Sequence, residues 1–177
     1  MRVFFALWPD AATRTCIANA AAALRLTDGA RPISRDNFHL TLAFVGEVPN
    51  SGIAVLQQIG RNQRAAGCTI KLDAYEHWPE PQVVAAVARK TPQALLDLWL
   101  CLRRDLALQP DPNHRRPRWR AHVTLARKVV QAPVLQAMSP ICWSARSFSL
   151  IRSDTSGAHS VYTVVDTWPL LDETPKP

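Results

Sequence analysis

Two segments of the chain share a residue pattern that could do chemistry. The first, Phe38–Glu47, reads FHLTLAFVGE, and the second, Ala121–Arg127, reads AHVTLAR. Each has a histidine, an apolar residue, a threonine, an apolar residue and an alanine in the same order. One copy would most often be a surface pair or a core histidine, but two copies indicate an internal duplication or a two-lobed fold. If the lobes face each other, two histidines and two threonines converge on one cleft.

Both segments have the apolar and β-branched composition of a strand. Because strand side chains alternate between faces, each histidine shares a face with the threonine two residues later, about 6–7 Å away along the backbone. The cleft faces are expected to carry His39, Thr41 and Ala43 in the first segment and His122, Thr124 and Ala126 in the second. The opposite faces are expected in the core: Leu40, Leu42, Phe44, Val123 and Leu125.

Two histidines on opposite sides of one phosphorus could cleave a phosphodiester by in-line displacement. One would be the base that activates the nucleophile and the other the acid that protonates the departing oxygen, since the ordinary histidine pKa of about 6.5 lies near working pH. Each such proton transfer contributes roughly 10²–10⁴-fold to a rate. The threonine hydroxyls could donate hydrogen bonds to the non-bridging oxygens, where negative charge gathers.

Metal binding is the competing use of His39 and His122. A metal site usually needs three or four protein ligands, and neither segment carries a carboxylate on the His-Thr face or matches a HExxH pattern. The four cysteines lie far apart and form no CxxC pair, which argues against zinc and against a disulfide framework. We therefore expect no metal and no cofactor.

The rest of the chain supplies the elements that must position the two motif strands. Further strands are predicted over residues 3–8, 69–75, 83–88, 147–151 and 161–168, with 69–75 and 83–88 paired as a hairpin. A first helix is predicted over residues 11–26, with Asp10 as its N-cap. A second helix is predicted from about Ser51 to about residue 66. A third helix is predicted to begin at Pro92, with Thr91 as its N-cap. This order predicts an α+β fold of mostly antiparallel sheets with helices packed outside. With 47% apolar residues, the chain can form a single domain over residues 1–177, made of two interleaved lobes with one motif each.

The charge of the chain favours an anionic partner. It has 21 Lys and Arg against 14 Asp and Glu, a net charge of +7. Basic residues are dense just before the second motif, where arginines with an interleaved aromatic suit RNA contact and base stacking. The candidates are Arg115, Arg116, Arg118 and Trp119, and His114 could contact phosphate beside them. The alternative is a solvated basic loop with Trp119 packed underneath.

The sequence shows no targeting or membrane segment. The first residues lead straight into a strand-like run, without the charged region, long apolar region and cleavage site of a signal peptide. No apolar run approaches the ~20 residues of a membrane span. We expect a cytoplasmic protein with no membrane partner.

At these motifs the chain resembles the 2H phosphoesterases, and most of all the bacterial RNA 2′,3′-cyclic phosphodiesterases, also called 2′-5′ RNA ligases. The matching pieces are spread over nearly the whole chain: VFFALWP at 3–9, NFHLTLAFVGEV at 37–48, HVTLAR at 122–127, and the stretch from Tyr162 to Leu170 with Trp168-Pro169. A single HxTx motif would carry no weight. The pair, followed by LAFVGEV and by LAR, is specific.

The resemblance implies a pseudo-twofold, two-lobed α+β fold with both motifs lining a central cleft. It implies metal-independent hydrolysis of RNA 2′,3′-cyclic phosphate ends to 2′-phosphate, and related enzymes also join RNA ends reversibly through a 2′-5′ bond. Carried over by position, His39 is the proton donor and His122 the proton acceptor, while Thr41, Thr124 and Arg127 bind the substrate phosphate. Strict alternation places Arg127 on the face opposite His122, so it reaches phosphate only if the strand ends or bulges there. We expect a monomer.

Two alternatives stay open from the sequence. One is a phosphodiesterase that acts on a small cyclic nucleotide or an ADP-ribose cyclic phosphate, and the other is a non-catalytic nucleotide- or RNA-binding module. The near symmetry of the two motifs also leaves open which histidine is the acid and which is the base. The physiological RNA and the balance between hydrolysis and ligation carry no signature in the residues.

Overall fold

The computed structural model describes residues 1–108, 119–154 and 160–172 of the 177-residue chain. Its helices are α1 (Ala11–Ala22), α2 (Ile53–Asn62) and α3 (Gln93–Asp105), with short 3₁₀ turns at Arg35–Asn37 and Asn50–Gly52. Its strands are β1 (Arg2–Leu7), β2 (Arg31–Pro32), β3 (Leu40–Glu47), β4 (Cys68–Leu72), β5 (Ala74–Trp78), β6 (Val83–Val87), β7 (His122–Arg127), β8 (Ile141–Ala145), β9 (Ser147–Asp154) and β10 (Val161–Pro169).

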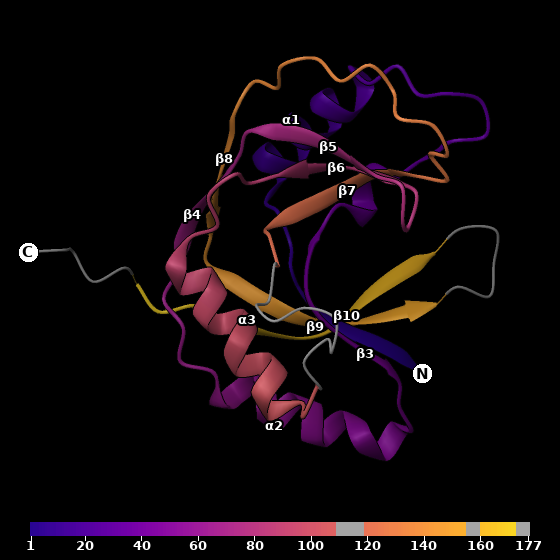
Figure 1. Cartoon of the computed structure of the whole chain (residues 1–177). Helices are drawn as coiled ribbons and strands as arrows, with labels where there is room; N and C mark the ends of the chain where they lie inside the picture. Colours follow the sequence, from indigo (N-terminus) through magenta and orange to yellow (C-terminus); the bar gives the residue numbers. More distant parts are fainter. Residues whose placement is uncertain (109–118, 155–159, 173–177) are drawn as a thin grey trace, which may run out of the picture.

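The strands form two four-stranded sheets and one two-stranded sheet among the described residues. The orders are β10-β9-β1-β3, β2-β7-β6-β5 and β4-β8, and every pair of strands in them is antiparallel. Figure 1 shows β5, β6 and β7 with α1 in the upper half of the molecule, and β3, β9 and β10 with α2 and α3 in the lower half. The predicted α+β class with mostly antiparallel sheets and helices outside is therefore confirmed.

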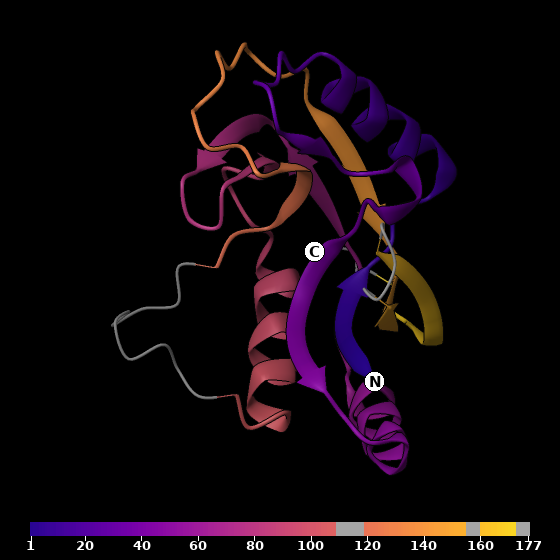
Figure 2. The same ribbon diagram turned by 90° about the vertical axis from the view of Figure 1, so that its right-hand side faces the viewer.

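The chain passes repeatedly between the two halves. It leaves β1 for α1, which contacts β8, and returns to β3, which pairs with β1. Figure 2 shows α3 alongside β3, and these two elements are in contact. The motif strands β3 and β7 also contact each other although they belong to different sheets. The connectivity thus brings the two predicted motifs together where the halves meet.

The first sheet has a core face that packs against the helices. On β1 this face carries Val3, Phe5 and Leu7, all fully buried, and the Phe5 ring packs against Phe148 and Trp168. Gly60 of α2 lies directly on Trp168, because a Cβ atom at this glycine would come within 2.4 Å of the indole ring. The absence of a side chain at position 60 therefore lets α2 approach the sheet closely.

Several element boundaries differ from the sequence prediction. Both early helices end sooner than expected, at Ala22 and Asn62, although Asp10 does cap α1 through a 2.7 Å hydrogen bond from the backbone N–H of Thr13. The cap of α3 is Pro92. Thr91 instead uses its hydroxyl to accept a hydrogen bond from the backbone N–H of Ala121, just before the second motif.

The prediction of a single strand over residues 69–75 was wrong. This segment breaks at Asp73, so that β4 pairs with β8 and only β5 pairs with β6 as a hairpin. The strand β8 itself was missed, because residues 131–141 were assigned to a loop and the next strand was predicted only from residue 147. At the other end of the chain, Leu171 is held by backbone hydrogen bonds with Ala65 and Gly67.

Both motif strands contain a β-bulge at the same place. In the pairing of β1 with β3, Phe5 lies opposite Ala43 and Ala6 opposite Thr41, which leaves Leu42 as the extra residue. Beyond a bulge the alternation of faces is reversed. Phe44 therefore shares the face of Thr41, and its side chain is 61% exposed. The prediction that Phe44 lies in the core was wrong, whereas Leu40 and Leu42 are buried as predicted.

The bulge in β7 falls at Leu125. Ala85 of β6 lies opposite Thr124 and the next residue, Val84, lies opposite Ala126, so Leu125 has no partner in the pairing. Arg127 then lies opposite Val83, on the same face as His122 and Thr124. The condition set by the sequence, that the strand must bulge for Arg127 to reach this face, is met. For the same reason Ala126 lies on the opposite face from the one predicted, and it is buried.

Candidate active site

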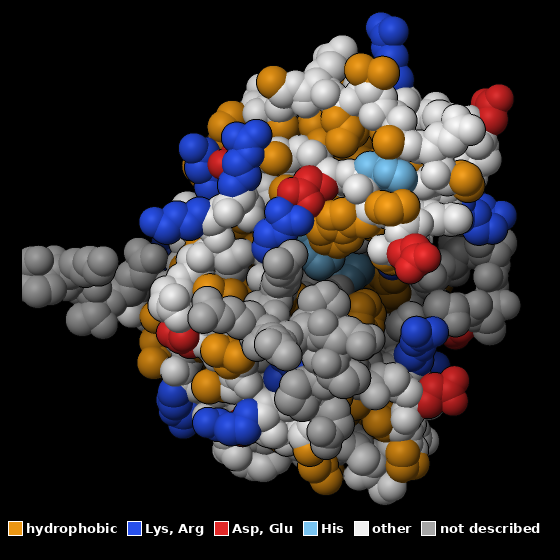
Figure 3. All heavy atoms as spheres, in the orientation of Figure 1, with side chains coloured by type: hydrophobic (Ala, Val, Ile, Leu, Met, Phe, Trp, Pro, Cys, Tyr) orange, Lys and Arg blue, Asp and Glu red, His pale blue; other side chains and the backbone are white. Residues whose placement is uncertain are grey.

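The two motifs meet at a cleft of about 740 Å³ between the two halves. Its lining includes His39, Thr124 and Arg127 from the motifs, together with Asn37 and Tyr162. Thr41 lies on the face of β3 that also carries Phe44, and His122 lies on the face of β7 that also carries Thr124 and Arg127. Neither Thr41 nor His122 is part of the cleft lining. Figure 3 shows histidine side chains in the hollow between the halves, beside hydrophobic side chains. The structure therefore brings both HxTx motifs to one place.

Aromatic rings enclose the imidazole of His39. Trp8 stacks on it at 5.7 Å between ring centroids, Phe4 lies at 5.0 Å, and Tyr162 meets it edge-on at 5.2 Å. This burial lowers the pKa of His39 from its ordinary 6.5 to about 4, and the positive charges of Arg127 and His122 act in the same direction. His39 is therefore neutral near pH 7 in the free protein.

His122 lies in a more polar setting. Trp78 meets its ring edge-on at 4.7 Å, and burial again lowers its pKa. Two charged neighbours act in opposite directions, because Arg120 lowers this pKa and Glu76 raises it. Glu76 forms an ion pair with Arg120 and accepts a 2.9 Å hydrogen bond from the Trp78 indole nitrogen. Sequence reasoning missed both Glu76 and Trp78, which lie on β5 far from either motif.

Each histidine is oriented by a hydrogen bond between its Nδ1 atom and the backbone carbonyl oxygen two residues earlier. His39 Nδ1 lies 2.7 Å from the carbonyl oxygen of Asn37, and His122 Nδ1 lies 2.8 Å from the carbonyl oxygen of Arg120. A carbonyl oxygen can only accept, so Nδ1 carries the proton in each ring. The Nε2 atom of each neutral imidazole then has its lone pair free. This is the atom that a general base or a general acid would use.

Arg127 is close enough to His39 for its charge to lower the histidine pKa, and both residues line the cleft. Its guanidinium is exposed. His39, Thr124 and Arg127 line the cleft, and Thr41 and His122 belong to the same two contacting motif segments, so the site offers groups that can bind an anion and exchange protons with it.

The predicted RNA contacts before the second motif divide into two groups. Arg115, Arg116 and Arg118 lie outside the described residues, as does His114. Trp119 stacks on Trp99 of α3 at 5.3 Å between ring centroids and 11° between ring planes. That face of the Trp119 indole is therefore covered by protein and cannot stack on a base.

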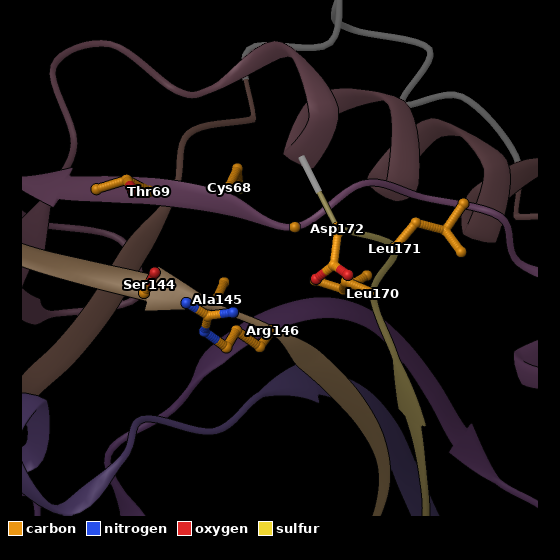
Figure 4. Close-up of a pocket in the computed structure, with 9 residues that line it drawn as sticks. Cys68, Thr69, Ser144, Ala145, Arg146, Leu170, Leu171 and Asp172 are labelled. Atoms are coloured by element: carbon orange, nitrogen blue, oxygen red, sulfur yellow. The ribbon is translucent and has the colours of Figure 1, made fainter. Parts of the chain in front are cut away.

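A second pocket, of about 270 Å³, lies away from both motifs. Figure 4 shows it between Cys68 and Thr69 of β4, Ser144 at the end of β8, and the C-terminal residues Leu170 and Asp172. The lining carries both a positive side chain, Arg146, and a negative one, Asp172. It holds no histidine or other motif residue, so the cleft between the halves is the better candidate for an active site.

The described residues show neither a cluster of metal ligands nor a membrane-spanning helix. Within residues 1–108, 119–154 and 160–172, no group of three or more His, Cys, Asp or Glu side chains could hold a metal ion. In the same part of the chain, none of the helices has both the length and the apolar character of a membrane span.

Comparison with known proteins agrees with this geometry. The chain is similar to the RNA 2′,3′-cyclic phosphodiesterase of Escherichia coli (strain K12), with 31% identity over 171 residues that cover 96% of both proteins. It is also similar to the RNA 2′,3′-cyclic phosphodiesterase of Thermus thermophilus, with 28% identity over 184 residues that cover 98% of this chain and 92% of the relative.

Solved structures show the same likeness over almost the whole chain. A structure described as a phosphoesterase matches with a TM-score of 0.86 and 30% identity, covering 96% of this chain and 98% of the other. The complex of E. coli LigT with NADP+ matches with a TM-score of 0.84 and 30% identity, covering 96% and 97%. The family model described as the 2′-5′ RNA ligase superfamily matches residues 12–157. The chain therefore belongs to the 2′-5′ RNA ligase superfamily of 2H phosphoesterases, as its paired motifs predicted.

Proposed function

We propose that this protein hydrolyses RNA 2′,3′-cyclic phosphate ends to 2′-phosphates by two-histidine acid–base catalysis. The observation that carries the proposal is the matched pair of histidines at the start of the two contacting motif strands, each with Nδ1 bound to a backbone carbonyl so that Nε2 keeps its lone pair. The RNA specificity is supported by the relatives named RNA 2′,3′-cyclic phosphodiesterase. The substrate class is thus a cyclic phosphodiester at the end of RNA.

In the proposed reaction a water molecule attacks the phosphorus, and His122 Nε2 accepts its proton. The bond between phosphorus and the 3′ oxygen breaks, and His39 Nε2 donates its proton to that oxygen. The products are a 2′-phosphate and a 3′ hydroxyl. Thr41, Thr124 and Arg127 stabilise the charge that develops on the non-bridging oxygens. When the 5′ hydroxyl of a second RNA replaces the water, the same proton transfers form a 2′-5′ bond, and their reversal cleaves it.

The electrostatics of the cleft suit these roles. His39 has a low pKa and becomes a strong acid once it carries a proton, and the negative charge of a bound phosphate favours that protonated form. Glu76 stabilises the imidazolium that forms on His122 when it accepts a proton. We propose that no metal takes part, since two imidazoles, two hydroxyls and an arginine already supply the proton transfers and the charge stabilisation.

The first test uses a short RNA that ends in a 2′,3′-cyclic phosphate, with the purified protein in excess EDTA. Phosphorus NMR should identify a 2′-phosphate, and His39→Ala or His122→Ala should lower kcat by at least about 10²-fold. Lys71→Ala, an exposed change on β4, is the control for the effect of substitution itself. A 3′-phosphate product would contradict the assigned geometry, and RNA binding without turnover would indicate a binding module.

A sulfur-substituted substrate separates the acid from the base. If the 3′ bridging oxygen is replaced by sulfur, the thiolate leaves without protonation, so the general acid becomes dispensable. His39→Ala should then recover most of the wild-type kcat on this substrate, whereas His122→Ala should not. The opposite pattern would exchange the two roles. A monomeric state and a cytoplasmic location stay predictions.

A further inference from the structure

We propose that the cleft contains a second phosphate site, formed by Arg31 and Lys128 beside Arg127, which binds the phosphate on the 5′ carbon of the reacting nucleotide. The inference rests on the proposed function and deepens it, because it defines which cyclic phosphates the enzyme prefers. Its ligand is a phosphate monoester or diester one ribose away from the cyclic phosphate. All three cationic side chains line the same cavity as His39 and Thr124.

Arg31 and Arg127 face each other directly across neighbouring strands. They are paired residues in the antiparallel register of β2 and β7, and both side chains are exposed. Like charges directly opposite each other on a sheet are destabilising. Within residues 1–108, 119–154 and 160–172, no ion pair compensates Arg31, Arg127 or Lys128. An anion between them would remove the repulsion, and none of the described residues that line the cavity is acidic.

Lys128 reaches this cavity through an unusual backbone conformation. Neighbouring residues on a regular strand point to opposite faces, yet both Arg127 and Lys128 line the cleft. Lys128 has φ of 57°, in the left-handed region that residues with a Cβ seldom adopt, and Gln82, just before the neighbouring strand β6, has φ of 61°. A 3.0 Å hydrogen bond from the backbone N–H of Val129 to the carbonyl of Gln82 joins the two segments. Strained positions of this kind concentrate at functional sites.

The segment that carries Arg31 is fixed to the second motif itself. The backbone N–H of Ile33 donates a 2.8 Å hydrogen bond to the carbonyl of Leu125, the extra residue of the bulge in β7. The bulge thus directs Arg127 into the cleft and also anchors the strand that presents Arg31. Both arginines are held in place relative to Thr124, which is the arrangement that recognition of two linked phosphates requires.

The two anion sites fit one nucleotide. Thr124 and His39 bind the cyclic phosphate in the proposed function, while Arg31 and Lys128 lie in the same cavity beyond Arg127. In RNA that ends in a cyclic phosphate, the next phosphate is attached to the 5′ carbon of the same ribose. A substrate with that phosphate should therefore be preferred over a nucleoside cyclic phosphate that lacks it.

The test compares three substrates with the same base: the nucleoside 2′,3′-cyclic phosphate, its 5′-phosphorylated form, and a dinucleotide ending in the cyclic phosphate. The measured quantity is the ratio of kcat/KM with and without the 5′ phosphate. We expect a ratio of about 10 or more in the wild-type protein, because charge-assisted hydrogen bonds to phosphate are strong. Arg31→Gln and Lys128→Asn should each reduce the ratio at least about fivefold, since asparagine tolerates the left-handed conformation.

Two controls keep the test specific. Lys71→Asn removes an equal charge from the exposed face of β4 and should leave the ratio unchanged, while Arg31→Lys should retain most of it. A ratio near 1 in the wild-type protein, or one insensitive to Arg31→Gln and Lys128→Asn, overturns the inference even when the plain cyclic phosphate is hydrolysed. Absence of any hydrolysis refutes the proposed function instead. A raised ratio for the dinucleotide assigns the site to the RNA backbone, and one confined to the 5′-phosphorylated nucleotide assigns it to small nucleotides.

Discussion

At the scale of single residues, the two histidines form equivalent hydrogen bonds to the backbone but have different surroundings. His39 is enclosed by aromatic rings, whereas His122 lies near a carboxylate and a guanidinium. Glu76 holds Arg120 by an ion pair and Trp78 by a hydrogen bond, and its negative charge raises the pKa of His122 against the effect of burial. A carboxylate in this position stabilises an imidazolium as it forms, which is what a general base needs in the transition state.

Replacing Glu76 by glutamine should therefore weaken the base. Glu76→Gln removes the negative charge and leaves Arg120 uncompensated, so the pKa of His122 falls further and the acidic limb of the kcat/KM profile moves to lower pH. We expect kcat to fall several-fold near pH 7, because a weaker base accepts the proton of the attacking water less readily. The measurement is the pH profile with a cyclic phosphate substrate.

Glu47→Gln, which removes the same charge at the far end of β3, is the matched control and should leave the profile unchanged. An acidic limb that stays in place or moves to higher pH in Glu76→Gln would show that this carboxylate does not act on the base.

The motif residues could be predicted from the sequence because their spacing is repeated, and repetition is visible without a structure. Thr41, His122 and Thr124 lie on the strand faces that alternation assigned to them, and His39, just before β3, packs against Phe4 and Trp8. Glu76 could not be predicted in this way. It reaches His122 only through the pairing of β5 with β6 and of β6 with β7, which no local pattern encodes.

At the scale of secondary structure, the bulges in β3 and β7 decide what each motif presents to the cleft. Each bulge follows the HxT sequence by one residue, at Leu42 and at Leu125, and reverses the faces beyond it. The first strand consequently presents Phe44 where the second presents Arg127. Neither bulge is marked by glycine, so alternation predicted the faces correctly only as far as the threonines. Helix ends at Ala22 and Asn62 were missed for a related reason, because apolar spacing continues past the last hydrogen-bonded turn.

Two alanine substitutions separated by one residue test the bulge in β3. Leu42→Ala removes a buried side chain and should destabilise the fold by about 2–5 kcal/mol. Phe44→Ala removes a larger but 61% exposed ring and should cost roughly 1 kcal/mol or less. Urea unfolding of both variants gives the comparison directly. A larger loss of stability for Phe44→Ala than for Leu42→Ala would mean that β3 alternates regularly and that Phe44 belongs to the core.

At the scale of the whole molecule, the site is built where two sheets meet, so its titrating groups are partly removed from water by folding. Burial lowers the pKa of both His39 and His122, which means that each is held neutral in the folded chain more strongly than in the unfolded chain. The free energy of unfolding must then depend on pH in the range where these histidines take up protons.

Stability should decrease as the pH falls from about 7 to about 4.5. In the unfolded chain His39 has its ordinary pKa of 6.5 and is protonated in this range, whereas in the folded chain its pKa is about 4 and the ring stays neutral. The unfolded state therefore binds more protons, and the loss for His39 is on the order of 3 kcal/mol, with a further loss in the same direction from His122. Asp10, Glu76 and Asp105 have lowered pKa values, and the stability that they contribute is lost mainly below about pH 5, so the slope above that pH reports on the histidines. Urea unfolding at several pH values measures the slope. His39→Gln, which keeps a polar side chain but does not titrate, should flatten it, and an equally steep slope in this variant would show that the pH dependence arises elsewhere in the molecule.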